Sequence, residues 1–262
     1  MQQSNPRYEL LSKGVFIDPM VATDKLVALA RQLRPRLCTH ELIRVGAESD
    51  GGYLIPDDLF GITACFSPGV DDIASFEQDL YRRGIGSHLA DYSVESVPSG
   101  TAVLSFIRKF LGANTYDNFI SLEEWVRGLA SDAVDDSLLL QMDIEGGEYE
   151  TLLACPSAVL SKFRIMVIEF HQVESWAQSD FFKMVEATFR KLLSTHYVVH
   201  NHPNNAMGIV DMNGFHAPRV FELTFMKKTR TEVMGWAETP HKLDRRNVDY
   251  LPEIVLPKMW LE

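Results

Sequence analysis

The sequence lacks several features that would place it in a common class of proteins. It has no apolar run long enough to cross a bilayer, and no apolar segment near residue 1 resembles a secretory signal. Its three cysteines show no CxxC spacing, so the pattern indicates neither a disulfide framework nor a zinc site. We therefore expect a cytoplasmic protein with reduced thiols and no membrane partner.

Positive charge is also scarce in this chain. Lys and Arg total 25 against 36 Asp and Glu, which gives a formal net charge of −11. A nucleic-acid backbone or an anionic membrane surface requires clustered Lys and Arg. The balance of charge thus argues against nucleic acid or an anionic membrane as a partner.

The length and composition fit one large folded unit. With 262 residues and 46% hydrophobic residues, the chain can bury a substantial core. Residues 1–40 are predicted to be an N-terminal helical extension, because Leu26, Leu29 and Leu33 have helical spacing and Pro35 follows them. This extension would cover one side of the domain, or act as a lid or a homodimer contact. Residues 41–262 contain no linker-like stretch and are predicted to be the main domain.

Strand-like and helix-like segments alternate through the main domain. The predicted strands are 62–66, 86–92, 101–111, 137–142, 163–170, 197–200 and 220–226. The pattern of 101–111 is also compatible with a helix. Such alternation predicts an α/β fold with a mostly parallel, Rossmann-like sheet of seven strands and helices on both faces.

The stretch that organises this prediction is 138–150. An apolar run, Leu-Leu-Leu-Gln-Met, is typical of a buried strand, and it passes abruptly into Asp143, Glu145, Gly146 and Gly147. Open α/β sheets bind their ligands at the carboxyl ends of such strands. The two acids should therefore lie at the mouth of a crevice, and the glycines should allow a sharp turn there.

Polar residues follow the other predicted strands as well, and parallel strands end at one edge of a sheet. These residues are Gly69, Asp91, Glu169, His171, His200 and His202. Asp91 lies about 20 residues after a glycine turn, a spacing that suits the ribose hydroxyls of NAD or of S-adenosylmethionine. The incomplete glycine motif counts against the pyrophosphate of NAD, and the surrounding acidity favours a sulfonium cation.

Several of these segments carry a family resemblance. The run 141–150 resembles the K-x-D-x-E-G-x-E motif of FkbM-type S-adenosylmethionine-dependent methyltransferases. The likeness extends to Ser67-Pro68-Gly69-Val70, to Asp91, to Ser121-Leu122-Glu123-Glu124 and to Ile168-Glu169-Phe170-His171. The first motif departs from the usual Asp-x-Gly-Ala-Asn-x-Gly, because Ser67 stands in place of its acid.

The resemblance implies a class I methyltransferase fold, S-adenosylmethionine as cofactor, and methylation of a hydroxyl on a sugar, natural product or other small metabolite. It also implies roles for individual residues. Ser67 and Gly69 would lie at the cofactor, Asp91 would bind its ribose, Ser121 and Leu122 would lie near the adenine, and Asp143 would lie beside the methionine or the acceptor.

Transfer of a methyl group to a hydroxyl requires a base, and two histidines suit that role. His171 and His202 are the predicted bases, since an imidazole titrates near neutral pH. Asp143 or Glu145 would orient the base. Alternatively, Asp143, Glu169 and His171 would bind a divalent metal such as Mg²⁺.

Two other functions remain open on these residues. One is an NAD-dependent oxidoreductase on a similar sheet, and the other is a non-catalytic domain that keeps the fold and binds a partner.

Overall fold

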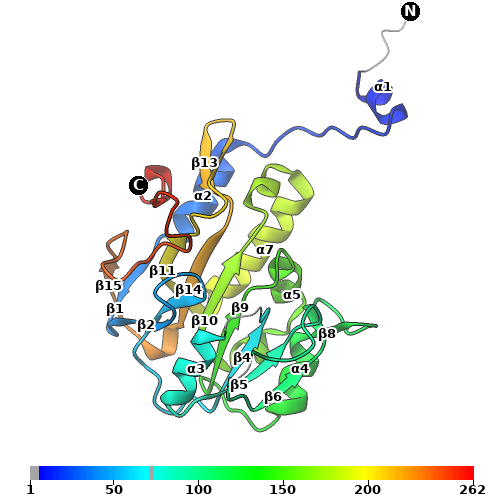
Figure 1. Cartoon of the computed structure of the whole chain (residues 1–262). Helices are drawn as coiled ribbons and strands as arrows, with labels where there is room; N and C mark the ends of the chain where they lie inside the picture. The colour runs from blue at the N-terminus through cyan, green and yellow to red at the C-terminus, as the bar shows by residue number, and fades with distance from the viewer. Residues whose placement is uncertain (1–5, 71–73, 99) are drawn as a thin grey trace, which may run out of the picture.

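A seven-stranded sheet forms the centre of the protein (Figure 1). The computed structural model describes residues 6–70, 74–98 and 100–262. The strand order is β11-β14-β10-β9-β4-β5-β6. The strands are β4 (Ala64–Pro68), β5 (Gly86–Ala90), β6 (Ser105–Ile107), β9 (Leu138–Met142), β10 (Phe163–Phe170), β11 (His196–Pro203) and β14 (Phe221–Lys227).

The direction of the strands defines the fold class. β14 runs antiparallel to both of its neighbours, and the other pairs in the sheet are parallel. A parallel sheet that reverses its strand order at β4 and β9 and holds one antiparallel strand near its edge is the arrangement of class I methyltransferases. The predicted fold is confirmed, and a crevice is expected at the carboxyl ends of β4 and β9.

One face of the sheet packs against helices. α2 (Thr23–Gln32), α4 (Leu122–Leu129), α5 (Glu148–Ala154), α6 (Ser157–Leu160) and α7 (Ser179–Thr195) contribute to this core. Leu26 of α2 and Phe189 of α7 are fully buried there, as is Trp260 near the end of the chain in η3 (Lys258–Trp260). The predicted N-terminal helix is thus part of the main core, and the last residues pack on the same side of the sheet.

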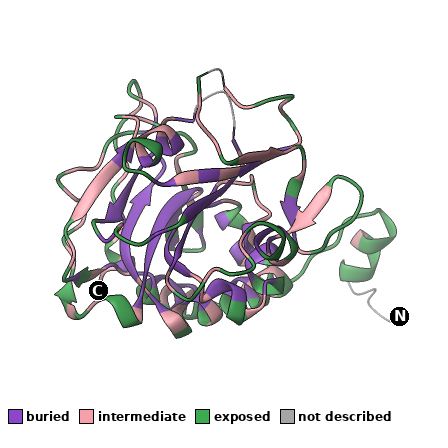
Figure 2. Ribbon diagram, turned by 90° about the horizontal axis from the view of Figure 1, so that it is seen from below, coloured by how far each residue is buried: buried purple, intermediate pink, exposed green. Residues whose placement is uncertain are grey.

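A hairpin and one helix cover the opposite face. The hairpin joins β2 (Leu42–Gly46) to β3 (Gly52–Pro56) through a turn that contains Asp50-Gly51, and α3 (Ser75–Arg82) packs beside it. Tyr53 and Phe76 meet edge to face, with ring centroids 5.6 Å apart. Figure 2 shows that the central strands are buried between the two layers. The hairpin contacts β10 and β14 and places its turn over their polar residues.

The remaining elements are short. They are α1 (Pro6–Ser12), β1 (Arg36–Cys38) paired with β15 (Val233–Trp236), β7 (Phe110–Gly112) paired with β8 (Phe119–Ser121), β12 (Ile209–Met212) paired with β13 (Phe215–Pro218), η1 (Val173–Ala177) and η2 (Lys228–Arg230). α1 has no buried residue and extends away from the body (Figure 1). The three cysteines are buried and free. Within the described ranges, no helix is long and apolar enough to cross a bilayer.

Two predicted strands differ from the observed ones. The segment predicted as a strand at 101–111 contains only β6 and the start of β7. The strand predicted to end at His200 continues to Pro203 as β11, because its polar residues pair with β14 through Phe221. The sequence pattern did not predict this extension, because the added residues are polar. Whether His and Asn side chains are buried depends on partners elsewhere in the chain.

Candidate functional site

Three predicted residues from different strand ends meet in one cavity. Gly69 follows β4, Asp91 follows β5 and Asp143 follows β9, and all three line a cavity of about 370 Å³. The other lining residues are Ala90, Ser93, Phe110, Leu111, Phe119, Ile144, Glu145, Gly147 and Glu150. The cavity therefore lies at the switch point of the sheet, with acids on one part of its wall and apolar side chains on another.

Gly69 allows two strand ends to approach closely. Its φ is +85°, and a Cβ built on it would lie 1.4 Å from the backbone oxygen of Asp143. The backbone of this turn is also fixed by hydrogen bonds, from Gly69 N to Ala90 O at 3.0 Å and from Asp143 N to Pro68 O at 3.3 Å. Only glycine fits here, because any larger residue would be strained and would separate β4 from β9.

Asp91 has an ordered carboxylate at the end of β5. Its Oδ1 accepts hydrogen bonds from the backbone N and the Oγ of Ser93, each at 2.7 Å. This fixes the side chain while Oδ2 takes no part in either bond. The rings of Phe110 and Phe119, which no sequence motif predicted, form an apolar wall of the cavity, with centroids 5.6 Å apart.

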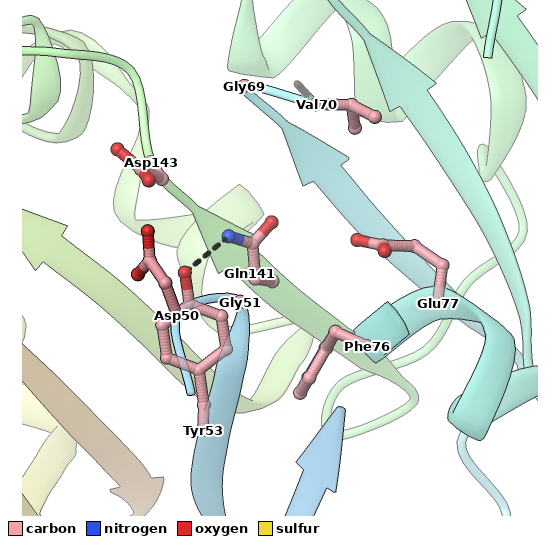
Figure 3. A pocket seen from close by; sticks show the side chains of 9 residues that line it. All are labelled: Asp50, Gly51, Tyr53, Gly69, Val70, Phe76, Glu77, Gln141 and Asp143. Carbon is pink, nitrogen blue, oxygen red and sulfur yellow. Dashed lines mark hydrogen bonds between the residues drawn. The ribbon is translucent and has the colours of Figure 1, made fainter. Parts of the chain in front are cut away.

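A second, smaller cavity adjoins the first. It measures about 100 Å³ and is lined by Asp50, Gly51, Tyr53, Gly69, Val70, Phe76, Glu77, Gln141 and Asp143 (Figure 3). Gly69 and Asp143 line both cavities. Asp143 thus stands at the junction between a larger cavity and a narrow one, the position from which a side chain can contact ligands on both sides.

Asp143 and His171 form the charged centre of the junction. Burial raises the pKa of Asp143 to about 7, with nearby Glu145 and Glu148 adding to the rise and His171 opposing it. The Oδ1 of Asp143 is buried and has no hydrogen-bond partner among the described residues. A carboxyl group that titrates near neutral pH is suited to proton transfer.

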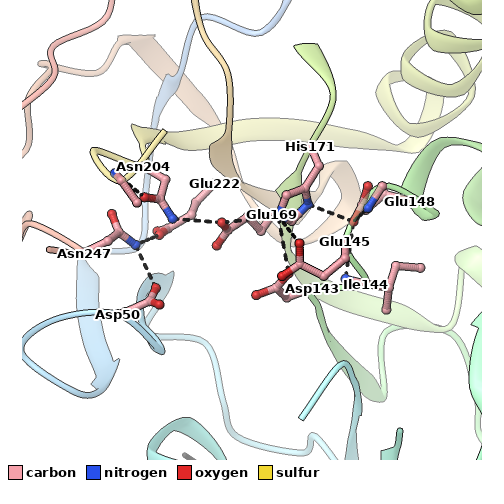
Figure 4. Close-up of polar contacts among 12 residues, drawn as sticks. Asp50, Asp143, Ile144, Glu145, Glu148, Glu169, His171, Asn204, Glu222 and Asn247 are labelled. Carbon is pink, nitrogen blue, oxygen red and sulfur yellow. Dashed lines mark hydrogen bonds and ion pairs between the residues drawn. The ribbon is translucent and has the colours of Figure 1, made fainter. Parts of the chain in front are cut away.

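Buried Glu148 positions His171. Its Oε1 accepts hydrogen bonds from the backbone N of Ile144 at 3.3 Å and of Gly146 at 3.0 Å, and it lies 3.1 Å from Nδ1 of His171 (Figure 4). The imidazole Nε2 lies 3.5 Å from Glu145 and 3.8 Å from Asp143. Burial lowers the pKa of His171, but Glu148 and the other carboxylates outweigh it and raise the pKa overall.

A second group of acids lies beside the first, beneath the β2–β3 turn. Glu169 on β10 and Glu222 on β14 are directly opposite in register, and each is 4% exposed. Burial raises the pKa of both, and their own proximity and Asp50 contribute in the same direction for Glu169. Nε2 of His171 lies 3.7 Å from Oε1 of Glu169, which connects the two groups.

Ser67, predicted at the cofactor, has another role in the structure. It is fully buried behind the smaller cavity, where its Oγ contacts Glu77 and lies 2.6 Å from Gln141 Oε1. One hydroxyl has one hydrogen, so the Glu77 carboxyl supplies the other, in keeping with the rise in its pKa on burial. Ser67 therefore supports the wall and does not line it.

Ser121 and Leu122 lie at a different hollow. Ser121 is the N-cap of α4 and accepts a hydrogen bond from the backbone N of Glu124, as the capping box predicts. Both residues line a hollow with Thr115 and Arg127, and not the cavity of Asp91. Their predicted contact with adenine has no geometric support, since neighbouring Leu111 and Phe119 form that wall instead.

The predicted base His202 does not face Asp143. It lies inside β11 opposite Glu222, 5% exposed, and its Nδ1 is 3.7 Å from Asp244. Glu222 stands between His202 and the strand that carries Glu169. His202 thus lies among buried acids and apart from Asp143, and its role as a base stays a prediction.

The three predicted metal ligands belong to two different groups of side chains in the structure. Asp143 and His171 group with Glu145, whereas Glu169 groups with Asp50 and Glu222. An imidazole with a raised pKa already supplies positive charge to the first group. Its ligand atoms are close enough together to hold an ion, and its contacts are also those of an ion-pair network.

The sheet topology and the cavity at its switch point define the class: a class I methyltransferase fold with a ligand site at the carboxyl ends of β4, β5 and β9. Residues 120–195 match the sequence model described as the Methyltransferase FkbM domain. The match covers the segment from the end of β8 to the end of α7, and over this segment the predicted resemblance to FkbM-type methyltransferases is confirmed.

Comparison with other proteins adds little beyond the family. No curated protein matches the chain. Among solved structures, the fibrillarin/Nop5p complex is similar with 11% identity and a TM-score of 0.39, covering 64% of this chain and 74% of that one. The Methanococcus jannaschii fibrillarin pre-rRNA processing protein has 9% identity and a TM-score of 0.38, covering 72% and 83%. At such TM-scores these structures support no assignment of fold or function. The fold class rests on the topology of the sheet.

Proposed function

We propose that this methyltransferase uses S-adenosylmethionine to methylate a hydroxyl group on a small metabolite, sugar or natural product. The observation that carries the proposal is the position of Asp143, which lines both the larger cavity and the narrow one. A methyl donor in the first cavity and an acceptor hydroxyl in the second would meet beside this carboxyl group.

The chemistry of the larger cavity suits this cofactor. Asp91 offers a carboxylate for the ribose hydroxyls, and Phe110 and Phe119 offer an apolar wall for the adenine. Four of the lining residues are acidic and none is Lys or Arg. A cationic ligand without phosphate fits such a wall, whereas the pyrophosphate of NAD would face carboxylates.

The cofactor, when bound, supplies a methyl group on a positively charged sulfur. The protein must then align the acceptor oxygen and remove its proton. Asp143 is the group placed for this, because its pKa of about 7 leaves much of it ionised at neutral pH. His171, fixed by Glu148, would stabilise the ionised Asp143 and orient it.

The narrow cavity would hold only the reacting end of the acceptor. Its volume of about 100 Å³ fits a hydroxyl-bearing carbon and little more, so the rest of the acceptor would extend outward past Asp50 and Gly51 at the hairpin turn. Tyr53, whose hydroxyl lies 3.5 Å from Nε2 of Gln141, would form part of the floor (Figure 3).

Calorimetric titration of the full chain with S-adenosylmethionine, its demethylated product and NAD tests the cofactor directly. We expect micromolar binding of the first two and none of NAD. Asp91→Asn should weaken binding by about tenfold or more, because it removes a charged acceptor for ribose hydroxyls. Asp132→Asn, an equal change of charge on an exposed loop, is the matched control and should bind normally.

The acceptor is then sought by incubating protein and cofactor with pools of hydroxyl-bearing metabolites and measuring labelled methyl transfer. Transfer to an oxygen supports the proposal. Binding of NAD in place of the methyl donor would support an oxidoreductase, and cofactor binding with methylation of nitrogen or a carboxyl group would contradict O-methylation.

A further inference from the structure

Three carboxyl groups meet under the hairpin turn, next to the ion-pair network of His171. Glu169 and Glu222 face one another across β10 and β14, and Asp50 reaches them from the turn between β2 and β3 (Figure 4). One oxygen of each residue lies within 4.8 Å of one oxygen of the other two. Residues far apart in the chain thus form one compact, oxygen-rich group.

Two amides bind this group without neutralising it. Asn204 Nδ2 donates to Oε1 of Glu169 at 2.9 Å, and Asn247 Nδ2 donates to Glu222 at 2.7 Å and to Asp50 at 3.0 Å. Both amides are uncharged. Like charges directly opposite in a sheet repel one another, and buried charge requires a partner.

Two imidazoles offset the charge only in part. His202 lies opposite Glu222 in register, but its Nδ1 is 3.7 Å from Asp244, so this imidazole does not serve Glu222 alone. Nε2 of His171 lies 3.7 Å from Oε1 of Glu169, the oxygen that already accepts a hydrogen bond from an amide. The same imidazole also contacts the carboxylates of its own ion-pair network.

The other oxygen of Glu169 has no hydrogen-bond partner in the part of the chain that the structure describes. This Oε2 is buried and makes no hydrogen bond among the described residues, and the whole residue is only 4% exposed. Figure 4 shows the carboxyl group between Glu222 and Asp143, on the side toward Asp50. A buried carboxylate oxygen in such a position is costly unless a proton or a cation occupies the space beside it.

The spacing fits a hard divalent cation. Two oxygens bound to one Ca²⁺, each at about 2.4 Å, lie at most about 4.8 Å apart, so the three oxygens are close enough together to bind one ion. Such ions prefer carboxylate oxygens and complete their coordination with water. Asp50 is exposed, so its side of the group gives access to solvent.

We propose that Asp50, Glu169 and Glu222 form a binding site for a hard divalent cation, Ca²⁺, Mg²⁺ or Mn²⁺. The ion would tie the β2–β3 turn to β10 and β14. Since Asp50 also lines the narrow cavity, the ion would stand at the wall of that cavity. The site takes no ligand from Asp143 or His171, and its occupancy does not depend on the methyl donor.

The test uses the full chain after treatment with a chelator, in the absence of S-adenosylmethionine. Mn²⁺ binding is measured by electron paramagnetic resonance, and thermal unfolding is followed with Ca²⁺, Mg²⁺ or Mn²⁺ at millimolar concentration. We expect one bound Mn²⁺ per chain and a rise in the unfolding temperature. Glu169→Gln and Glu222→Gln should each weaken Mn²⁺ binding by about tenfold or more, because each removes a charged ligand.

Matched variants distinguish loss of this site from misfolding and from binding at the neighbouring acids. Without metal, Glu169→Gln and Glu222→Gln should unfold at the wild-type temperature or above it, since they relieve repulsion. Glu145→Gln, which changes an acid of the neighbouring group, should keep Mn²⁺ binding. Absence of bound Mn²⁺ in the wild type, or loss of binding in Glu145→Gln with retention in Glu222→Gln, would overturn the proposal.

Discussion

Replacement of Asp143 by Asn should make the protein more stable above neutral pH. The carboxyl is 28% exposed, and burial raises its pKa from 3.8 to about 7. At about 1.4 kcal/mol per pKa unit, ionising Asp143 in the folded state costs up to about 4 kcal/mol. The attraction of His171 is already contained in this pKa, and the carboxyl keeps some access to water, so we expect Asp143→Asn to gain about 1 to 3 kcal/mol at pH 8.

The sign of this effect follows from the direction of the pKa shift. Below pH 3.8 the carboxyl is protonated in both the folded and the unfolded protein, and its ionisation costs nothing. Between pH 3.8 and about 7 the unfolded chain ionises first, so the folded state loses stability as the pH rises. Asn cannot ionise, and the advantage of Asp143→Asn should therefore grow through this window and level off above pH 7.

Urea unfolding of the two proteins at a series of pH values from 4 to 9 measures the difference, and Asp132→Asn serves as an exposed control. The control should change the free energy of unfolding by less than about 0.5 kcal/mol. Equal stability of Asp143→Asn and the wild type across the whole range, or a loss at pH 8, would refute the view of Asp143 as a desolvated acid held for its chemistry.

Three further predictions concern the same framework. Gly69→Ala should lower the free energy of unfolding in urea by at least about 3 kcal/mol and abolish cofactor binding. The reason is that it combines strain at φ +85° with a clash against Asp143. Wild-type stability of this variant would contradict the close approach of Gly69 to Asp143. Glu148→Gln should lower the pKa of His171, as NMR titration would show, because a charge that raises it is removed; an unchanged pKa would mean that Glu148 does not position the ring. Burial lowers the pKa of His196 to about 4, so wild-type stability should fall as the pH drops from 6.5 to 4, and His196→Gln should lack that fall.

The parts of the fold that could be predicted depend on local patterns. β9 and β10 are buried on both faces, and their continuous apolar runs identify them in sequence. Ser121 carries a capping box and begins α4 as predicted. The meeting of Gly69, Asp91 and Asp143 could also be predicted, because parallel strands end at one edge.

The parts that could not be predicted depend on contacts between distant segments. His202 appeared to follow a strand, but it lies within β11, which pairs with β14, and Asp244, far along the chain, lies beside its imidazole. The turn chemistry of Asp50 says nothing about its approach to Glu222, which Asn247 bridges. Phe110 and Phe119 have no motif, and only the pairing of β7 with β8 brings them to the cavity.

The most direct test of the proposed site is a crystal structure of the full chain with S-adenosylhomocysteine. We predict the ribose at Asp91, the adenine against Phe119 and the sulfur facing Asp143, at the junction of the two cavities. Density for the ligand at another place, or with its sulfur turned away from Asp143, would contradict the assignment of this strand-end cavity as the site of methyl transfer.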